Sequence, residues 1–285
     1  MSLGHGVWAA GGSSVRGASH VRRDMPNQDA LALSPSGPGG KPTLDAEAFI
    51  AAIADGHGAP AYHHSDIGSR LAVDCAIEAL RRFVGGGGAE GMIEEILARW
   101  RAAVMADHQA RAQGGGGGDW VEASTDVLIP YGATLAAVAM AQDQLLVLQI
   151  GDSDVLFGYP DGRIERPLPV DHGLVGEQTY SLCALDAALR FRARILVPDS
   201  AENWPDFVML STDGIAKSFA DEKAFLAIAR QYRETLQKVG LTEVLGRLDD
   251  WLAEVSKRGS GDDVTLCLAS RTPGRAPTAD DDSDW

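Results

Sequence analysis

The sequence predicts an α+β layered fold built on mainly antiparallel sheets. Short apolar runs bounded by turn residues indicate strands. They come in groups rather than in alternation with helices: strands, two helices, many strands, two helices and a last strand. A doubly wound parallel sheet would alternate strand and helix instead. At 285 residues and 45% hydrophobic composition the chain can bury a large core, so we expect one domain over 13–270.

The N-terminal part contains the first strands. The residues through Gly12 are small and polar, and we expect them to fray. The Ser/Gly/Pro cluster Ser34–Gly40 indicates a loop between two strands. Phe49–Ala54 is a short apolar run that stops at Asp55-Gly56, which is typical of a buried strand.

Two long helices follow, at Asp66–Val84 and Glu90–Gln113, because apolar residues recur there at helical spacing along one face. The glycine runs Gly85–Gly88 and Gly114–Gly118 end them. No Gly-Lys-Ser/Thr follows either run, so we interpret both as linkers rather than phosphate-binding loops.

From Thr134 onward the apolar pattern becomes that of strands. The predicted strands are Thr134–Ala141, Gln144–Ile150, Asp154–Tyr159, Arg190–Val197, Phe207–Leu210 and Val264–Ala269. Two amphipathic helices, Asp221–Val239 and Leu241–Lys257, precede the last strand. The acidic tail over 271–285 is predicted to be disordered.

The charge balance excludes several classes of partner. The chain has 25 basic and 40 acidic residues, a net charge of −15, which repels nucleic acid and anionic membranes. No segment approaches the roughly 20 apolar residues that a membrane span needs. Cys75, Cys183 and Cys267 match no zinc-ligand spacing and suggest no disulfide framework. We therefore expect a soluble, cytoplasmic protein.

Aspartates repeatedly terminate the apolar strands, usually beside glycine. They are Asp55, Asp152, Asp213 and Asp262. Taken singly, an Asp-Gly pair is common turn chemistry. Recurrence at four strand ends favours a site, because gathered carboxylates repel each other unless cations bind between them. Ligands that are all oxygen select Mg²⁺ or Mn²⁺ rather than zinc.

Six short motifs, in order along the chain, carry a resemblance to a known family. They are Asn27-Gln28-Asp29-Ala30, Ala54-Asp55-Gly56-His57-Gly58, Tyr131-Gly132-Ala133-Thr134, Gly151-Asp152-Ser153, Ser211-Thr212-Asp213-Gly214 and Gly259-Ser260-Gly261-Asp262-Asp263-Val264-Thr265. In wording and order this set resembles the type 2C, metal-dependent protein phosphatases, and the match runs from Gly17 to Ala269.

The resemblance implies a four-layer α-β-β-α sandwich of two antiparallel sheets with helices outside. It implies hydrolysis of phosphoserine and phosphothreonine in proteins by a water or hydroxide that bridges two Mn²⁺ or Mg²⁺ ions. By carry-over, Asp55 would bridge both ions and the Gly56 carbonyl would bind one. Asp213 and Asp262 would hold the other ion, and Asp29 would hold a metal-bound water.

Two further roles follow from the same resemblance. His57, next to the bridging aspartate, is the candidate acid for protonating the leaving oxygen. The family's phosphate-binding arginine falls at Asp24 here, so Arg22 or Arg23 would serve, and Arg23 is the nearer candidate. Both arginines also fit solvated loop charges.

The chain departs from the family pattern at three places. Gln28 stands where many relatives have glutamate, so we expect weaker metal affinity without loss of function. Asp152 matches a ligand of a third ion, but Lys217 replaces that ion's second aspartate. The sequence therefore argues against a third ion and leaves Asp152 as a water ligand or turn residue. Asp263 replaces a common asparagine, with no effect that the sequence predicts.

The segment Asp171–Leu189 falls where the family has a variable flap over the cleft. Its His172, Glu177 and Tyr180 are candidates for substrate contact, and a polar surface loop is the alternative.

Two other functions remain open at this point. A phosphatase-like binding module would dock phosphoproteins with little turnover. Retention of Asp55, Asp213 and Asp262 argues against it, whereas Gln28 and the displaced arginine keep it open. A hydrolase of small phosphorylated metabolites is the second, although no small-molecule motif supports it. The composition, with no appended span or sensor domain, indicates a stand-alone bacterial enzyme that opposes a Ser/Thr kinase.

Overall fold

The computed structural model describes residues 6–36, 43–114, 125–141, 143–169 and 179–272. In these residues eleven strands pair into two sheets. All strand pairs in both sheets are antiparallel. The predicted α+β fold class with antiparallel sheets is confirmed.

The first sheet has six strands in the order β3-β1-β11-β10-β7-β8. Their bounds are β3 (Thr43–Ala46), β1 (Val7–Val15), β11 (Val264–Thr272), β10 (Phe207–Ser211), β7 (Asp154–Gly158) and β8 (Ile164–Glu165). The first and last of the described strands, β1 and β11, therefore pair in the middle of this sheet, where Val7 pairs with Thr272 and Val15 with Val264.

The second sheet has five strands in the order β2-β4-β5-β6-β9. Their bounds are β2 (Ala30–Ser34), β4 (Phe49–Ala54), β5 (Leu135–Met140), β6 (Leu145–Ile150) and β9 (Arg192–Leu196). Every residue of β4, β5 and β6 is buried. Their sequences are almost continuously apolar because both faces of this sheet are covered.

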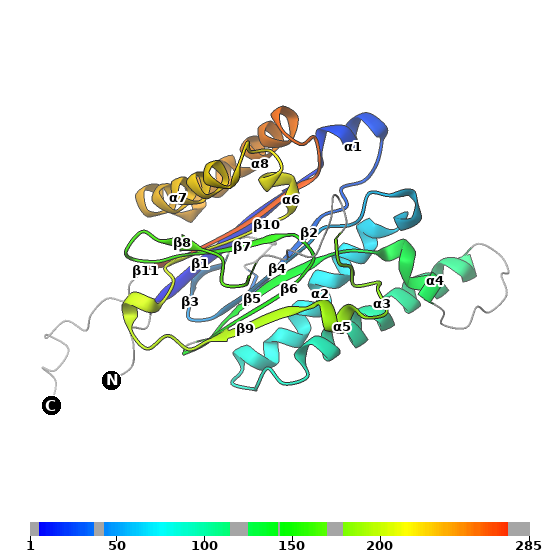
Figure 1. Cartoon of the computed structure of the whole chain (residues 1–285), viewed down its shortest axis with the longest axis horizontal. Coiled ribbons are helices and arrows are strands. Elements are labelled where there is room, and N and C mark those ends of the chain that lie inside the picture. Colours follow the sequence, from blue (N-terminus) through cyan, green and yellow to red (C-terminus); the bar gives the residue numbers. More distant parts are fainter. Residues whose placement is uncertain (1–5, 37–42, 115–124, 142, 170–178, 273–285) are drawn as a thin grey trace, which may run out of the picture.

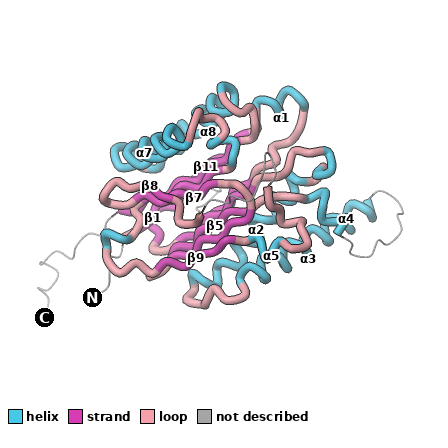
Figure 2. Tube along the Cα trace, in the orientation of Figure 1, coloured by secondary structure: helices cyan, strands magenta, loops and turns pink. Residues whose placement is uncertain are grey.

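Four long helices form the two outer layers, as Figure 1 and Figure 2 show. They are α2 (Ser65–Val84), α3 (Met92–Gly114), α7 (Glu222–Val239) and α8 (Leu241–Arg258). Helix α2 packs on β2, β4 and β5, and α3 packs on α2, whereas α8 packs on β1 and β11. The result is the predicted α-β-β-α sandwich.

Short helices connect these layers. The α-helical ones are α1 (Ala18–Arg23), α4 (Thr125–Leu128), α5 (Ala187–Arg190) and α6 (Asp213–Ala216), and the 3₁₀ turns are η2 (Pro60–Tyr62), η3 (Ile129–Tyr131) and η4 (Ala201–Asn203). None of the helices in the described residues combines the length and apolar character that crossing a membrane requires.

Three apolar clusters hold the four layers together. One lies between the helices α2 and α3 and the five-stranded sheet, and it includes Leu80 and Trp100. The middle one lies between the sheets, where the Trp8 and Phe49 rings are 5.2 Å apart. The third lies under α7 and α8, around Leu248. Each cluster removes apolar surface from water, the main force holding the layers together.

Three predictions about elements need correction. Val7–Gly12 does not fray, because Val7–Val15 forms β1 between two other strands, while residues 1–5 lie outside the described residues. Arg190 belongs to α5 rather than to the strand that follows it. Arg271 and Thr272 extend β11, while the rest of the predicted disordered tail, 273–285, lies outside the described residues.

The predicted helix limits hold closely. Helix α2 begins one residue before the predicted start, and α3 begins at Met92 rather than Glu90. Gly91 has a φ of 68°, which is not a helical conformation, so the helix begins after it. The glycines at 115–118 lie outside the described residues.

Candidate metal centre

A cleft of about 810 Å³ opens where the ends of strands from both sheets come together. The predicted site residues that line it are Arg23, Gln28, Asp55, Gly56, His57, Asp152, Asp213 and Asp262. His20, Tyr180, Lys217 and Asp263 line it as well. Among the described residues, Asp29 and Arg22 are not part of this lining: Asp29 is buried beside it and Arg22 is exposed on α1.

Asp55 is the first residue after β4, and its backbone is held on both sides by Thr134. The Asp55 amide donates to Thr134 Oγ1 at 3.0 Å, and the Thr134 amide donates to the Asp55 carbonyl at 2.8 Å. Gly56 follows, and a Cβ there would lie 2.6 Å from the Gln28 carbonyl oxygen. Only glycine lets the chain pass this close and turn the Asp55 side chain into the cleft.

Asp213 and Asp262 come from neighbouring strands of the six-stranded sheet. Asp213 follows β10 and begins α6, and Asp262 lies two residues before β11. Because β10 and β11 are antiparallel, the end of one strand lies beside the start of the other. A Cβ on Gly214 would lie 2.1 Å from the Asp263 carbonyl oxygen, so glycine at 214 permits this approach.

The carboxylates raise each other's affinity for protons. Burial raises the pKa of Asp55 well above its usual range, and the charges of Asp29, Asp213, Asp152 and Asp262 raise it further. Burial and the charge of Asp213 likewise raise the pKa of Asp152. Positive charge brought into this cleft would relieve that repulsion.

Lys217 supplies one such charge. Its Nζ lies 2.5 Å from Asp213 Oδ2. Burial alone would lower the pKa of the Lys217 ammonium, but Asp213, Asp152 and Asp55 together raise it above its ordinary value. Lys217 is therefore a permanent cation at neutral pH.

Asp29 is buried behind the cleft and held by hydroxyl groups. The Thr212 and Thr265 hydroxyls donate to its Oδ2 at 2.7 and 2.8 Å, and Asn27 Oδ1 accepts from its amide at 3.0 Å. Burial raises the pKa of Asp29 well above its usual range, while the two hydroxyl bonds act in the opposite direction. One of its two carboxylate oxygens is thus engaged within the protein.

Sequence reasoning missed a buried pair formed by His20 and Asp263. Asp263 accepts from the amides of Gly17 and Gln28, each at 2.6 Å, and from His20 Nδ1 at 2.8 Å. The hydrogen bond to Asp263 raises the pKa of His20. The other ring nitrogen, Nε2, is 3.7 Å from Asp262 Oδ1. The single signal for this pair in the sequence is the Asp262-Asp263 doublet.

The side-chain amide of Gln28 lines the cleft, and only its NH₂ group has a hydrogen-bond partner among the described residues. Its Nε2 donates to Ser65 Oγ at 2.7 Å, whereas its Oε1 is buried and has no hydrogen-bond partner among the described residues. A buried acceptor without a partner costs about 1–3 kcal/mol. A cation, or water held by one, would satisfy that oxygen.

His57 is half-buried at the cleft wall, with its ring edge-on to Tyr62 at 4.7 Å. Burial lowers its pKa to about 4, and the charge of Asp152 only partly opposes this. The imidazole is therefore neutral at pH 7. Tyr180 also lines the cleft, with the Arg190 guanidinium 4.7 Å above its ring, whereas His172 and Glu177 lie outside the described residues.

The donor set fits Mg²⁺ or Mn²⁺. The side chains that face the cleft from the three strand ends are carboxylates, and Gln28 adds an unpartnered amide oxygen. No three His, Cys, Asp or Glu side chains of the described residues lie close enough to enclose an ion by themselves. Mg²⁺ needs no such cage, because it binds through one or two carboxylates and keeps several waters.

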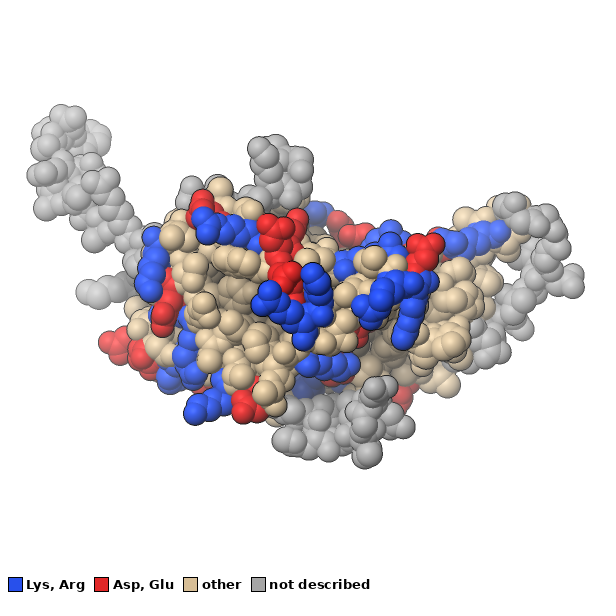
Figure 3. All heavy atoms as spheres, turned by 90° about the horizontal axis from the view of Figure 1, so that it is seen from above, with Lys and Arg blue, Asp and Glu red and all other residues tan. Residues whose placement is uncertain are grey.

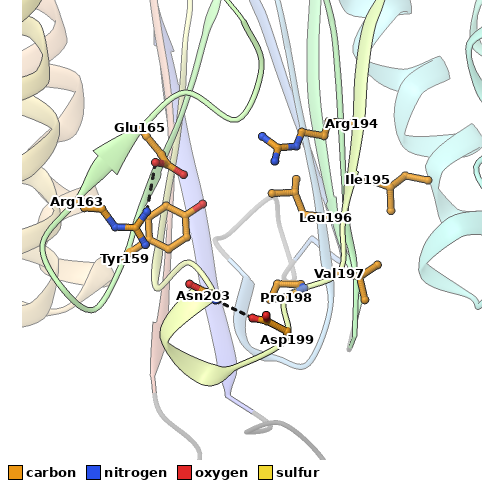
Figure 4. Close-up of a pocket in the computed structure, with 10 residues that line it drawn as sticks. All are labelled: Tyr159, Arg163, Glu165, Arg194, Ile195, Leu196, Val197, Pro198, Asp199 and Asn203. Atoms are coloured by element: carbon orange, nitrogen blue, oxygen red, sulfur yellow. Dashed lines mark hydrogen bonds and ion pairs between the residues drawn. The ribbon is translucent and has the colours of Figure 1, made fainter.

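A second hollow, of about 350 Å³, lies between the β7–β8 turn and β9. In Figure 4, Arg194 and Leu196 point toward Tyr159, and Ile195 and Val197 point away. Its two acidic side chains already have partners: Glu165 Oε2 lies 3.4 Å from Arg163, and Asp199 accepts from Asn203 at 2.7 Å. Arg194, which also lines this hollow, donates to the Pro167 carbonyl at 3.0 Å. The hollow does not gather several carboxylates as the first cleft does, so the first cleft is the candidate site.

Comparison with known proteins gives one family. The sequence profile described as protein phosphatase 2C matches residues 16–254. A search of curated protein sequences gave no match.

Solved structures with a similar fold include three at low identity. The serine/threonine phosphatase PstP/Ppp of Mycobacterium tuberculosis is 18% identical, with 93% of this chain and 98% of that chain covered and a TM-score of 0.55. PppA, a key regulatory component of T6SS in Pseudomonas aeruginosa, is also 18% identical, with 94% and 100% covered and a TM-score of 0.57. The catalytic domain of PstP in complex with two manganese ions is 19% identical, with 94% and 99% covered and a TM-score of 0.53. At these identities the likeness shows the fold alone.

Proposed function

The chain belongs to the protein phosphatase 2C family, and from this premise we propose that it is a metal-dependent phosphatase that hydrolyses phosphoserine and phosphothreonine in proteins. One observation carries the proposal. Asp55, Asp213 and Asp262, predicted from strand ends far apart in the sequence, all line the same cleft. A metabolite phosphatase has no comparable support in the described residues.

The carboxylates in and beside the cleft would bind the metal ions in different ways. Asp55 and the Gly56 carbonyl would hold one Mn²⁺ or Mg²⁺ ion, and Asp213 and Asp262 would hold the other, with water in the remaining positions. Asp29, Gln28 and Asp152 would bind through water. When bound, the ions lower the pKa of water and neutralise phosphoryl charge. Such cations would favour the charged form of Asp55, whose pKa is raised by burial and by the neighbouring carboxylates.

His57 and Arg23 complete the proposed machinery. Arg23 lines the cleft from α1 and would bind the phosphate, whereas Arg22 does not reach the lining. His57 would donate a proton to the leaving oxygen, which requires the imidazolium form. Burial opposes that form by lowering the pKa to about 4, and Asp152 favours it.

The proposed partner is a phosphorylated protein whose kinase the enzyme opposes, in the cytoplasm of a bacterium. The net charge of −15 disfavours nucleic acid as a ligand. On the face shown in Figure 3, acidic and basic side chains lie next to each other, and neither sign covers it. The three cysteines are free thiols, which suits a reducing compartment.

The test is hydrolysis of p-nitrophenyl phosphate and a phosphothreonine peptide, with and without Mn²⁺, by the wild type and Asp213→Asn. Asp250→Asn, on the exposed face of α8, is the matched control. We expect turnover that needs Mn²⁺, persists in Asp250→Asn and falls at least a hundredfold in Asp213→Asn, about the loss expected when one electrostatic group of a site is removed.

Folded wild-type protein that binds Mn²⁺ but hydrolyses neither compound would reject this function. The binding-module function would then be favoured. The Gln28 Oε1 atom, which has no partner among the described residues, and the Lys217–Asp213 ion pair are the observations behind that alternative.

A further inference from the structure

Lys217 lines the cleft but has no role in the proposed machinery. It caps the C-terminal end of the four-residue helix α6 and turns its side chain back toward the helix start. Its Nζ lies 2.5 Å from Asp213 Oδ2, and its side chain is half-exposed at 51%, facing the same cleft as Asp55 and Asp152.

The ordinary explanation for such a pair is helix stabilisation, which applies to Arg247 and Glu243 on the outer face of α8. It accounts poorly for Lys217. Helix α6 has only four residues, so an i,i+4 pair spans its whole length and supports little helix. The ammonium is instead attracted by three carboxylates, Asp213, Asp152 and Asp55, that follow three different strands.

Several carboxylates line the cleft, so a phosphate group would bind there more tightly if a positive charge of the protein faced it. Five aspartates line the cleft, and of these only Asp263 is satisfied by a ring nitrogen and two backbone amides. A phosphomonoester carries about two negative charges at pH 7 and would be repelled by the other four. Among the described lining residues, Arg23 and Lys217 are the permanent cations.

We propose that Lys217 is a substrate-binding residue whose ammonium contacts the phosphoryl oxygens and, until substrate and metal arrive, neutralises Asp213. This inference rests on the proposed function, because it takes the phosphoryl group as the ligand of the cleft. The half-exposed ammonium can leave Asp213 by rotation about its four side-chain bonds. A lysine makes strong, charge-assisted hydrogen bonds to phosphate.

A second consequence follows at the metal site. The Lys217 ammonium, 2.5 Å from Asp213 Oδ2, would lie close to a divalent ion bound at the same carboxylate, and the two positive charges repel each other, so Lys217 opposes binding of the ion there. Removing the ammonium should therefore strengthen metal binding and weaken phosphate binding. A lysine that served only structure would change neither in this way.

The experiment uses calorimetry on the full chain with two probes, Mn²⁺ alone and inorganic phosphate in saturating Mg²⁺. Lys217→Met removes the charge at similar length, Lys217→Arg keeps it, and Lys223→Met on α7 is the exposed control. For Lys217→Met we expect about tenfold tighter Mn²⁺ binding and about tenfold weaker phosphate binding, the scale of one nearby charge. Lys217→Arg and Lys223→Met should stay within about threefold of the wild type.

A Lys217→Met protein that keeps the wild-type affinity for either probe overturns the proposal. Hydrolysis of the phosphothreonine peptide, measured in parallel, tests the proposed function separately. Absence of turnover together with lysine-dependent phosphate binding would reject the enzymatic function and leave the role of Lys217 in place.

Discussion

Each aspartate near the cleft has its own set of partners, and these partners limit what it can bind. Asp263 accepts three hydrogen bonds and is 3% exposed, so it has little capacity left for an ion. Asp29 uses one oxygen on two hydroxyls. Asp55 faces mainly other carboxylates. Asp55, Asp152 and Asp262 thus have capacity left for cations, and Asp29 and Asp213 each keep one carboxylate oxygen outside these contacts.

The three hydrogen bonds that Asp263 accepts predict that replacing this residue lowers the stability of the fold. Asp263→Asn replaces one carboxylate oxygen by an NH₂ group that would face a backbone donor, either the Gly17 or the Gln28 amide. We expect a loss of about 1–3 kcal/mol in the free energy of unfolding. Urea unfolding in EDTA measures it without competition from divalent ions. Asp250→Asn should change stability by less than about 0.5 kcal/mol, and an equal loss in both variants would contradict the assignment.

Gln28 predicts a change in metal affinity. Gln28→Glu adds a negative charge at the wall of the cleft and can still bond Ser65, whose hydroxyl would then donate. We expect about tenfold tighter Mn²⁺ binding by calorimetry, because the added charge lies near the carboxylates that would hold the ions. Gln237→Glu, exposed on α7, is the control. Unchanged or weaker Mn²⁺ binding in Gln28→Glu would show that this side chain does not face the ions.

At the scale of elements, the site depends on where strands stop. The ends of β4, β6 and β10 and the start of β11 each deliver one aspartate to the cleft. Strands that are buried on both faces are rigid, so a side chain at the end of such a strand has a defined position. The glycines that follow Asp55 and Asp213, Gly56 and Gly214, approach other backbone segments so closely that a Cβ would not fit there.

The same burial predicts unreactive thiols. Burial raises the pKa of Cys75 on α2 to about 11 and that of Cys267 on β11 to about 12, and it also raises the pKa of Cys183. A raised thiol pKa means less thiolate, so at pH 8 roughly one Cys75 in a thousand is ionised. We expect no reaction of native protein with a disulfide reagent within minutes, and reaction of all three thiols in guanidinium.

The pH dependence has a definite sign. The unfolded thiols ionise at lower pH than the folded ones, so raising the pH through about 8.5 to 11 favours the unfolded state. Fast modification of a native thiol at pH 8 would contradict the burial of these cysteines.

At the scale of the molecule, the first and last described strands, β1 and β11, are neighbours inside the six-stranded sheet. Strand β1 lies between β3 and β11, and Trp8 is 4% exposed and packs against Phe49 of the other sheet. The N-terminal residues therefore join the two sheets rather than extend from them, and the folded unit includes residues before the predicted start at 13.

Trp8→Ala tests this arrangement. Removing a buried tryptophan leaves a cavity between the sheets, and we expect a loss of about 3–5 kcal/mol in the free energy of unfolding, measured in urea. Val21→Ala, at a position 57% exposed on α1, should cost far less. A Trp8→Ala loss below about 1 kcal/mol would restore the prediction that these residues fray.

The sequence by itself determined the kinds of elements, the fold class and the aspartates of the candidate site. Those are local properties: periodicity distinguishes α2 from β4, and Asp-Gly at a strand end is visible within a few residues. The order of the motifs added the family, since each motif keeps its place relative to the others.

Only the tertiary structure decided which groups are partners across the fold. Gly17 donates to Asp263 over 246 positions, and β1 pairs with β11 at opposite ends of the chain. Such contacts depend on packing rather than on neighbours in sequence, so the composition of residues through Gly12 suggested fraying. The Lys217–Asp213 pair is local in spacing, but its position in a cleft of carboxylates follows from the meeting of two sheets.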